Sequence, residues 1–394
     1  MSDITIKDLP GLLRSKLGTK KIKDTKLTNL MSKGENFGSE MIKLDVTTLD
    51  ENGKEETLHG VAKTLPQHEM MRQAFKVQVT YTNEMAFYDL IIPTLQAFQK
   101  ELGIKNVIDC FPECYATRKN LNASDIIDDN AVIVLENLQT AGFQNIDRHI
   151  GFDLETTKLV LRDLASLHAV PLALRLRKPE VFEKVIKPYC VPFEPMNDDD
   201  FLPVLKGIIE QNKEIAHLAS KVTGWKKTEL PVSDLFGTIM HNDMWTNNTM
   251  QKFENDRAVN NKLVDFQVYN YGSPANDVFF FLWSSVPQEV LEPNLDLLLN
   301  YYYEHFVNVL KEHKVDVSSY TYEKFLQEID KVGNSEFQHA FVFHNFVVHG
   351  RKNTEMEFPP PKIVVSEVLK MVPVKAKQKS YYMIQECTKR GWLK

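Results

Sequence analysis

The stretch FGTIMHNDMWTNNTM, residues 236–250, places a dense group of polar side chains directly after an apolar run. An apolar run of this kind predicts a buried strand, and a polar loop at a strand end is a common place for chemistry. Asp243 and Asn248 lie in this loop, and Asp265 follows seventeen residues later within a second predicted strand, KLVDF (262–266). We expect these three side chains to meet in one site at neighbouring ends of a hairpin.

The residue types in this segment match those that phosphoryl transfer uses. One aspartate accepts the proton of a hydroxyl group, and an Asn and a second Asp hold Mg²⁺ on the ATP phosphates. The spacing H-x-D-x-x-x-x-N, from His241 to Asn248, is that of the catalytic loop of kinase-like folds. The alternative is a solvated loop of turn-forming residues. The position between two apolar strands, with Asp265 on the second, favours the site.

A lysine and a glutamate nearer the N-terminus support the same interpretation. A kinase-like nucleotide site needs a lysine on a strand and a carboxylate on a helix that holds it. Lys63 stands in the predicted strand 57–64, and Glu84 opens the predicted helix that follows. Taken singly, an exposed lysine on an edge strand and an acidic residue in the first turn of a helix are ordinary features. Their order along the chain, together with the downstream loop, favours a nucleotide site.

A glycine-bearing segment, GENFGS (34–39), precedes the predicted strand 40–46. Glycine lets the backbone approach a ligand closely, and successive backbone amides attract anions. We therefore expect the backbone of this segment to lie over phosphates, although an ordinary loop has the same composition. The residues concerned are Gly34, Asn36, Gly38 and Ser39.

The hydrophobic pattern along the chain predicts an α+β protein with two lobes. Strands are expected at 40–46, 57–64 and 131–135, with one helix from about 82 to 102 that Pro93 kinks or divides. This makes residues 1–137 a small, β-rich nucleotide-binding lobe. Residues 138–394 read as a larger, mostly helical catalytic and acceptor-binding lobe, with a helical insertion at about 140–235.

The composition of the 394 residues limits the class of protein. A hydrophobic content of 43% and a charged content of 25% are typical of folded soluble domains. The net charge of −6, without a basic stripe, speaks against a nucleic-acid partner. No apolar run is long enough to span a bilayer, and the charged N-terminus is unlike a signal peptide, so we expect a cytoplasmic protein. No obligate protein partner is evident.

Nearly the whole chain resembles the ecdysteroid kinase-like family, also called CHK kinase-like, in the aminoglycoside and choline phosphotransferase branch of the protein-kinase-like fold. The resemblance lies in five segments: GENFGSEMIKLDV (34–46), NEMAFYDLIIPTL (83–95), LASLHA (164–169), HNDMWTNNTM (241–250) and LVDFQVYNYGSPANDVFFFL (263–282). It implies a bilobal kinase-like fold that uses ATP and Mg²⁺. It also implies that Asp243 is the catalytic base, that Asn248 and Asp265 bind Mg²⁺, and that Lys63 binds phosphate with Glu84 as its ion-pair partner.

The resemblance also assigns supporting roles. The segment VLENL (134–138) corresponds to the hinge, where backbone groups of Glu136 and Leu138 would face adenine. His241 would orient the catalytic loop, and Asp277 would tie that loop down, although capping a helix is a second explanation for Asp277. Position 242 is Asn where the family commonly has Gly. Asn tolerates the left-handed conformation, so the loop geometry is expected to persist.

The segment after Asp265 bears on the substrate. Only eleven residues separate Asp265 from Asp277, and Gln267 replaces the glycine of D-F-G, so the long activation loop of a protein kinase has no room here. The sequence therefore predicts a small-molecule hydroxyl kinase. The family implies an ecdysteroid, and the helices at 153–223 and 296–350 offer many apolar side chains with few obvious inward carboxylates.

Two other functions remain open. A choline-like or aminoglycoside-like acceptor would require acidic and aromatic residues around a cation. The acidic run 197–200 is a candidate, although a solvated loop is the simpler explanation. A nucleotide-binding module without turnover is the second alternative, and the joint presence of Lys63, Asp243, Asn248 and Asp265 argues against it.

Overall fold

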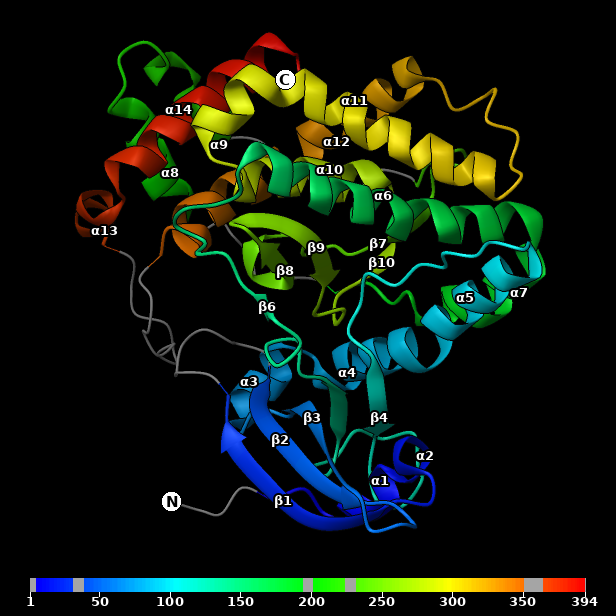
Figure 1. The fold of residues 1–394 in the computed structure, drawn as a ribbon. Coiled ribbons are helices and arrows are strands. Elements are labelled where there is room, and N and C mark those ends of the chain that lie inside the picture. Colours follow the sequence, from blue (N-terminus) through cyan, green and yellow to red (C-terminus); the bar gives the residue numbers. More distant parts are fainter. Residues whose placement is uncertain (1–4, 31–38, 194–200, 224–231, 351–363, 394) are drawn as a thin grey trace.

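The structure, a computed structural model, describes residues 5–30, 39–193, 201–223, 232–350 and 364–393. The chain folds as an α+β protein with a small lobe built around an antiparallel sheet and a larger, mostly helical lobe (Figure 1). The expected fold class is confirmed. The boundary after residue 137 and the extent of the helical insertion stay predictions.

The small lobe is built on a five-stranded antiparallel sheet with the strand order β1-β2-β3-β5-β4. Its strands are β1 (Lys21–Asn29), β2 (Glu40–Leu49), β3 (Glu55–Thr64), β4 (Cys114–Arg118) and β5 (Val132–Glu136). The sequence pattern did not predict β1, whose alternation is mostly of exposed and half-buried residues. The glycine-bearing segment therefore connects two strands, β1 and β2, instead of preceding the first strand.

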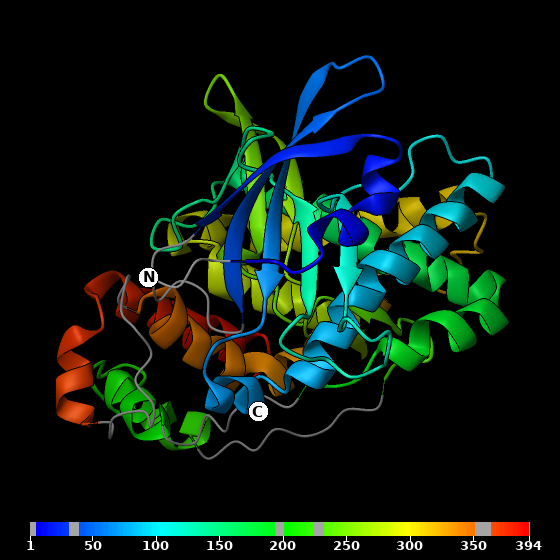
Figure 2. The same cartoon turned by 90° about the horizontal axis from the view of Figure 1, so that it is seen from below.

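The two faces of this sheet serve different purposes. Alternate residues of β2, such as Ile42 and Leu44, pack with Ala62 of β3 against the short helices α1 (Leu9–Leu12) and α2 (Arg14–Leu17). Because successive strand residues point to opposite faces, Lys63 points away from this cluster. Figure 2 shows the sheet in the view from below.

The opposite face of the sheet carries the helix on which Glu84 lies. The segment runs as α3 (Glu69–Ala74), α4 (Val77–Ala86), a five-residue π-helical turn (Phe87–Ile91) and α5 (Ile92–Glu101). Glu84 is the eighth residue of α4 and is buried, so its expected place at the opening of the helix was wrong. The helix begins earlier than predicted because polar residues such as Thr80 are buried against the sheet and do not show the apolar period. Pro93 stands at the start of α5, directly after the π-turn.

Two long helices form the centre of the large lobe. The helices of this lobe are α6 (Leu154–Arg177), α7 (Pro179–Val181), α8 (Leu202–Glu210), α9 (Ala219–Thr223), α10 (Pro274–Ser285), α11 (Gln288–Glu312), α12 (Tyr322–Phe343), α13 (Val365–Met371) and α14 (Val374–Lys389). Helix α6 packs along α11, and most of its residues are buried. The last part of the helical region expected at 153–223 is divided into α8, a 3₁₀ turn (Ala216–Leu218) and α9.

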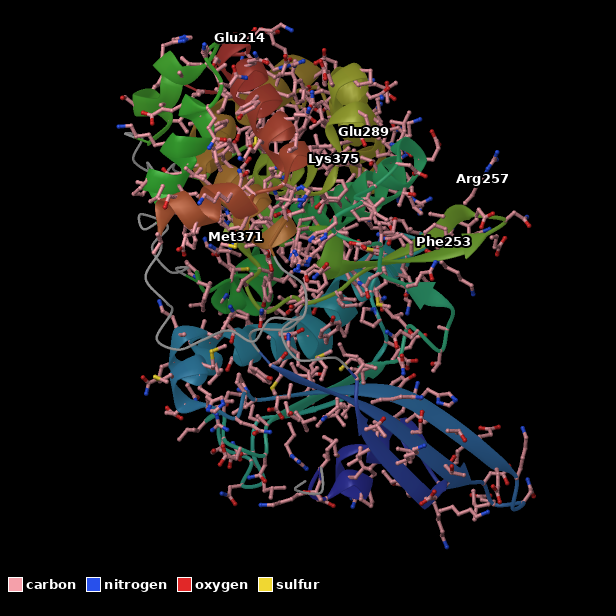
Figure 3. All side chains as sticks on the ribbon, turned by 90° about the vertical axis from the view of Figure 1, so that its left-hand side faces the viewer. Glu214, Phe253, Arg257, Glu289, Met371 and Lys375 are labelled. Atoms are coloured by element: carbon pink, nitrogen blue, oxygen red, sulfur yellow. The ribbon has the colours of Figure 1, made fainter. Side chains whose placement is uncertain are left out.

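Short strands beneath these helices hold the polar loops. β7 (Thr238–Met240) pairs with β10 (Asn270–Gly272), and β6 (Phe143–Gln144) pairs with β8 (Thr249–Glu254), which forms a hairpin with β9 (Arg257–Leu263). The hairpin projects from the lobe, with Arg257 close to its tip (Figure 3). β9 begins earlier than the predicted strand 262–266 and ends at Leu263. Asp265 therefore lies beyond the strand, in a loop.

In the described part of the chain, no helix has the length and apolar character needed to cross a membrane.

Candidate active site

Lys63 joins the two lobes through a pair of carboxylates. Its Nζ lies 2.6 Å from Oε2 of Glu84 on α4 and 2.7 Å from Oδ1 of Asp265, which belongs to the large lobe. Lys63 and Glu84 are almost fully buried, whereas the Asp265 side chain is about one-quarter exposed. The fold thus brings together three residues that are separated by up to 202 positions in the sequence.

Burial and charge act in opposite directions on this group. Burial alone would lower the pKa of Lys63, but the carboxylates of Asp265 and Glu84 outweigh it and raise that pKa above its usual value. Burial also raises the pKa of Glu84, and the attraction of Lys63 opposes this shift. The ammonium therefore stays charged at neutral pH.

The residue after Asp265 fixes this segment against the helix of Glu84. The rings of Phe266 and Phe87 are stacked with centroids 3.8 Å apart, and both residues are fully buried. Phe87 begins the π-turn that follows α4. Asp265 itself has a φ of 67°, a left-handed conformation that Asp adopts more readily than most residues. This turn directs the Asp265 carboxylate toward Lys63 while Phe266 stays in the core.

Asp243 and Asn248 contact one another in the loop after β7. The Asn248 Nδ2 donates to the backbone oxygen of Asp243 at 2.8 Å and to its Oδ2 at 2.9 Å. Asn248 stands at the end of a one-turn 3₁₀ helix (Thr246–Asn248), and Val264 N–H donates to its backbone oxygen at 3.0 Å. The structure therefore brings the Asp243 loop next to the segment that carries Asp265, as the sequence predicted.

The surroundings of Asp243 favour its neutral form more than water would. Burial raises the pKa of Asp243 to about 6, and the charge of Asp265 acts in the same direction. His241 and the hydrogen bond from Asn248 partly oppose this shift. A carboxylate with a pKa near 6 is mostly ionised at neutral pH and still accepts a proton readily, which suits a general base.

Asp277 anchors the catalytic loop from the first turn of α10. Its carboxylate accepts the backbone N–H of His241 and, at 2.8 Å, that of Asn242. His168 of α6 lies 2.9 Å from the same carboxylate through Nε2, and its Nδ1 lies 2.7 Å from the hydroxyl of Tyr302. All these side chains except Asn242 are fully buried, so the loop is held by a buried hydrogen-bond network. The helix itself is capped by another residue, Ser273.

Asn242 and His241 complete the shape of the loop. Asn242 has a φ of 66°, the left-handed conformation that its side chain tolerates. Its Nδ2 donates to the Val268 oxygen at 3.2 Å, a bond that glycine could not make. The His241 ring lies 2.9 Å from the Val264 oxygen and packs on the Phe266 ring at 4.6 Å, so it ties the loop to the Asp265 segment.

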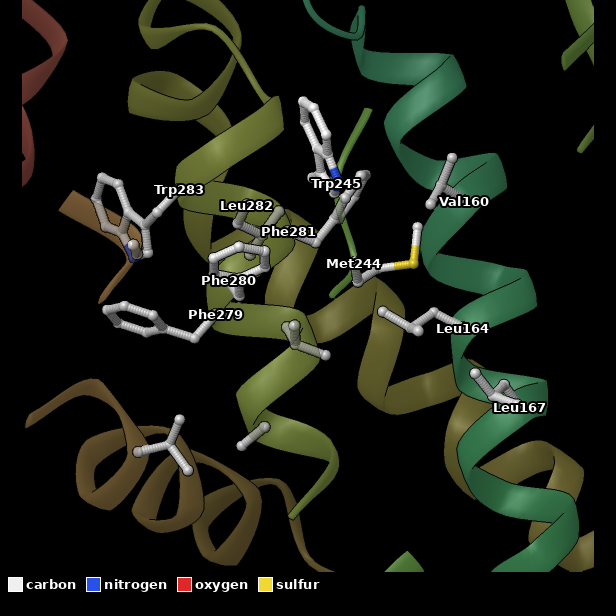
Figure 4. Packing of buried hydrophobic residues seen from close by; sticks show 14 of the residues in the cluster. Val160, Leu164, Leu167, Met244, Trp245, Phe279, Phe280, Phe281, Leu282 and Trp283 are labelled. Carbon is white, nitrogen blue, oxygen red and sulfur yellow. The ribbon is translucent and has the colours of Figure 1, made fainter. Parts of the chain in front are cut away.

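Apolar side chains support the loop from below. Met244 is fully buried and lies between α6, near Val160 and Leu164, and α10 (Figure 4). Trp245 packs edge-on against Phe343 of α12, with ring centroids 5.1 Å apart. The two residues after Asp243 thus fix the loop to three helices.

The structure describes only some of the other residues that were predicted to contact the nucleotide. Gly34, Asn36 and Gly38 lie outside the described residues, as does the acidic run 197–200, and Ser39 is buried at the start of β2. In the hinge, Glu136 N–H donates to the Glu113 oxygen at 2.8 Å, and the Leu138 oxygen accepts Phe143 N–H at 2.9 Å. An adenine ring would therefore have to contact the Glu136 oxygen and the Leu138 N–H.

The donor set of Asn248 and Asp265 fits Mg²⁺, which prefers oxygen ligands. Asn248 uses its Nδ2 on Asp243, which leaves Oδ1 as a ligand, and Asp265 uses only one carboxylate oxygen on Lys63. Among the described residues, no cluster of three or more His, Cys, Asp or Glu side chains is placed to hold a metal ion. Two protein ligands with phosphate oxygens and water suit Mg²⁺ in kinases.

Several residues that build this site were not found from the sequence. Tyr302 lies within an apolar helix, and Phe87 and Phe266 look like ordinary core aromatics. Nothing in their spacing points to His168 or to Asp265, because these contacts arise only from packing. The D-F dipeptide at 265–266 was the one local signal that could have drawn attention to Phe266.

Two solved structures to which the chain is similar are a putative aminoglycoside phosphotransferase from Ralstonia eutropha and choline kinase from Cryptosporidium parvum. Each is 12% identical to the chain with a TM-score of 0.42; they cover 94% of it and are themselves covered to 96% and 91%. Plasmodium vivax ethanolamine kinase is similar at 10% identity and a TM-score of 0.38, covering 92% of the chain and 82% of its own length. At this distance they assign no residue a role. No curated protein sequence gives a significant match.

The sequence profile of the ecdysteroid kinase-like family matches residues 33–315, which include Lys63, Glu84, the catalytic loop and the Asp265 segment. This match spans well over half of the chain and agrees with the geometry of the site. The chain therefore belongs to the ecdysteroid kinase-like family and is a small-molecule kinase, a phosphotransferase that acts on hydroxyl groups.

Proposed function

We propose that this protein transfers the γ-phosphoryl group of ATP to a hydroxyl of an apolar small molecule, with an ecdysteroid or a related steroid or xenobiotic alcohol as the acceptor. The contact of Lys63 with both Glu84 and Asp265 carries the proposal, because it assembles the lysine, its partner and a metal ligand from distant parts of the chain. Asp243 accepts a hydrogen bond from Asn248, the second proposed metal ligand.

Each residue has a distinct task in this reaction. Lys63 binds the phosphates, and Glu84 holds the lysine in place. Asp243 accepts the proton of the attacking hydroxyl, and its hydrogen bond with Asn248 fixes the orientation of its carboxylate. When bound by Asn248 and Asp265, Mg²⁺ would neutralise charge that develops on the phosphate oxygens.

The remaining contacts position the nucleotide. The backbone of Gly34, Asn36, Gly38 and Ser39 would cover the phosphates, and the hinge groups of Glu136 and Leu138 would contact adenine. His241 and Asp277 hold the loop of Asp243 without touching the substrate. This division separates residues that act on the phosphoryl group from residues that keep the site in shape.

The apolar residues of the large lobe favour an apolar acceptor. Phe343 and Phe346 on α12 and the π-turn after it face Trp245 and Phe201, respectively. A fused ring system would gain roughly 25 cal/mol for each Å² of apolar surface buried against such rings. One or two polar groups would then select the hydroxyl that faces Asp243.

A cationic acceptor is the second candidate, and one observation keeps it open. The sequence offered few obvious inward carboxylates in 296–350, yet Glu328 and Glu336 of α12 are both buried. Glu336 lies 3.0 Å from Asn276 Nδ2 and 3.2 Å from His339 Nδ1. Because a buried carboxylate attracts cations, choline-like and aminoglycoside-like acceptors remain to be tested.

An acceptor panel tests both candidates. Purified protein is incubated with labelled ATP and Mg²⁺ together with steroids, quaternary amines and aminoglycosides, and products are identified by mass and by phosphatase sensitivity. We expect one phosphate on a single alcohol of a polyhydroxylated steroid, with a KM between about 1 μM and 1 mM. Turnover of choline or an aminoglycoside without transfer to any apolar alcohol would reverse the order of the candidates.

The variant Asp243→Asn is the matched control for this panel. It keeps the shape of the side chain and removes proton acceptance, so kcat is expected to fall by a factor of about 10² to 10⁴ while ATP binding persists. Unchanged turnover would exclude Asp243 as the base.

A further inference from the structure

A cavity in the large lobe, distinct from the Lys63 and Asp243 site, gathers basic side chains. It has a volume of about 530 Å³ and lies where the loop before α6, the end of α10, the start of α11, the π-turn His344–Val348 and α14 meet. Six basic side chains line it: Arg148, His149, His344, His349, Lys375 and Lys379. Glu289 and Glu292 are its two carboxylates.

Lys379 is the unusual member of this group. It lines the cavity from α14 and is only 5% exposed. The described residues provide it with no hydrogen bond or ion pair. Glu289, the carboxylate whose charge acts on Lys379, is paired with Lys375 at 2.7 Å. A buried ammonium without a partner is costly, and such groups are usually paired in folded proteins.

Arg148 adds a positive charge to the cavity of Lys379, and three histidine rings line the cavity as well. The rings of His349 and His344 are 4.7 Å apart, and those of His349 and His149 are 5.9 Å apart. Arg148 donates to the Val348 oxygen at 2.7 Å and to the Gly350 oxygen at 3.2 Å, so its charge is held at the wall of the cavity. The second carboxylate, Glu292, accepts a hydrogen bond from Gln288 Nε2 at 2.9 Å.

The titration of these groups agrees with an excess of positive charge. Burial, with the nearby Lys375, lowers the pKa of Lys379 to about 7, and Glu289 only partly opposes this. Burial and the charge of Lys379 lower the pKa of His349 to about 4. A bound anion would reverse both shifts, because it would stabilise the protonated forms.

The walls of the cavity also provide neutral donors and apolar surface. Ser284 and Ser285 at the end of α10 are buried beside it, and Ile150, Pro287 and Tyr382 line it with carbon. The volume exceeds what a bare oxyanion fills. Figure 3 shows Glu289 and Lys375 near one another on α11 and α14 on this side of the molecule.

We propose that this cavity binds a small organic phosphate, with its phosphate group on Lys379 and its organic part against the apolar wall. A phosphate monoester carries close to two negative charges at neutral pH. That charge matches a site with one unpartnered lysine and several further basic groups. The site is separate from the nucleotide site, and the proposal does not depend on the identity of the acceptor.

Calorimetry with three probes tests the proposal on the full chain. The probes are phenyl phosphate, inorganic phosphate and benzoate, titrated in a phosphate-free buffer at constant ionic strength. Phenyl phosphate is expected to bind at one equivalent per chain. It should bind more tightly than inorganic phosphate, because it also buries its ring. If both phosphates bind equally, the ligand is free phosphate and the organic part of the proposal is wrong. Tighter binding of benzoate than of phenyl phosphate would overturn the phosphate assignment.

Variants locate the binding. Lys379→Met keeps the length of the side chain and should weaken phenyl phosphate binding tenfold or more, in line with the loss of a hydrogen bond to a charged group. The matched control is Lys389→Met, an exposed lysine on the same helix that does not line the cavity, and it should bind like the unaltered protein. Equal binding by the Lys379 and Lys389 variants would refute the site.

Two further variants remove the remaining ambiguities. Lys63→Met should leave this binding intact; if it abolishes binding while Lys379→Met does not, the phosphate occupies the nucleotide site. His349→Gln provides a second change in the cavity that does not depend on the folding of the Lys379 variant, and we expect weaker binding there as well. Unaltered binding in a folded His349→Gln and a folded Lys379→Met would also refute the proposal.

Discussion

At the residue scale, the position and the charge of the Lys63 side chain depend on two carboxylates. Its ammonium contacts Glu84 from its own lobe and Asp265 from the other, and both contacts are at hydrogen-bonding distance. Such residues act as a unit, so the effect of changing one depends on the presence of its partner.

The first prediction concerns this coupling. Lys63→Met and Glu84→Gln should each lower kcat/KM, Glu84→Gln less than Lys63→Met, because in the proposed mechanism the lysine itself contacts phosphate. The double variant should be little worse than Lys63→Met, with a coupling of about 0.5 to 3 kcal/mol in the double-mutant cycle. Additive losses in steady-state kinetics would show that the two residues act independently. Circular dichroism of each variant separates a loss of folding from a loss of catalysis.

The second prediction concerns Lys379 and pH. Its pKa is about 7 in the folded protein and about 10.4 when unfolded, so between these values the unfolded chain binds more protons. Stability conferred by this residue therefore rises with pH from about 7 to 10 and is lowest below pH 7, where the buried lysine is charged. Lys379→Met removes this dependence.

The measurement is urea unfolding of both proteins at pH 7 and pH 9 without phosphate. The stability advantage of Lys379→Met over the unaltered protein should shrink by about 2 to 3 kcal/mol over this interval, since each pKa unit is worth about 1.4 kcal/mol. Lys389→Met serves as the control with no such trend. A constant difference would mean that Lys379 keeps its ordinary pKa.

At the scale of elements, α10 connects the catalytic loop to the centre of the large lobe. Asp277 in its first turn accepts two backbone N–H groups of the loop and contacts His168 of α6. Since His168 also contacts Tyr302 of α11, one carboxylate links the loop to three helices. The loop after β7 is thus positioned by helices and by its own backbone.

The third prediction follows from this network. Asp277→Ala leaves buried donors without an acceptor and should lower the free energy of unfolding by about 3 to 5 kcal/mol, as the removal of one partner of a buried pair does. Glu312→Ala, at the exposed end of α11, should change it by no more than about 0.5 kcal/mol. Urea denaturation compares the two. Equal, small changes would mean that the network contributes little to stability.

At the scale of the whole molecule, the contact of Lys63 with Asp265 holds the small lobe against the large one. The stacked rings of Phe87 and Phe266 reinforce this contact from the core. A nucleotide bound between the lobes would engage the same residues, so its binding is expected to stabilise the folded protein as a whole.

The fourth prediction uses this linkage. In the presence of Mg²⁺, ATP at one hundred times its Kd should stabilise the protein by about 2.7 kcal/mol, seen as a rise in Tm. Asp265→Ala removes a proposed metal ligand and should lose the Mg²⁺-dependent part of the shift. Asp109→Ala, which changes an exposed carboxylate on the surface, is the control that should keep it. An Asp265 variant with the full shift would exclude its role as a ligand.

The sequence by itself determined the two-lobed α+β fold and the order of Lys63, Glu84 and the loop 241–248 along the chain, because these depend on local order. Alternating residues set the faces of β2, and the loop 241–248 directly follows the apolar strand β7. The family resemblance added the roles of Asp243, Asn248 and Asp265, and the structure brings Asp243 and Asn248 into contact and places Asp265 on Lys63.

Only the tertiary structure decided which partners these residues have. Glu84 moved from an expected first turn to a buried position because α4 packs against the sheet, and Asp265 left its predicted strand because Phe266 enters the core beside Phe87. The network of Asp277 and the cavity of Lys379 join segments that are tens to hundreds of residues apart. Contacts between such distant segments arise from the packing of whole elements, and no local pattern of residues encodes them.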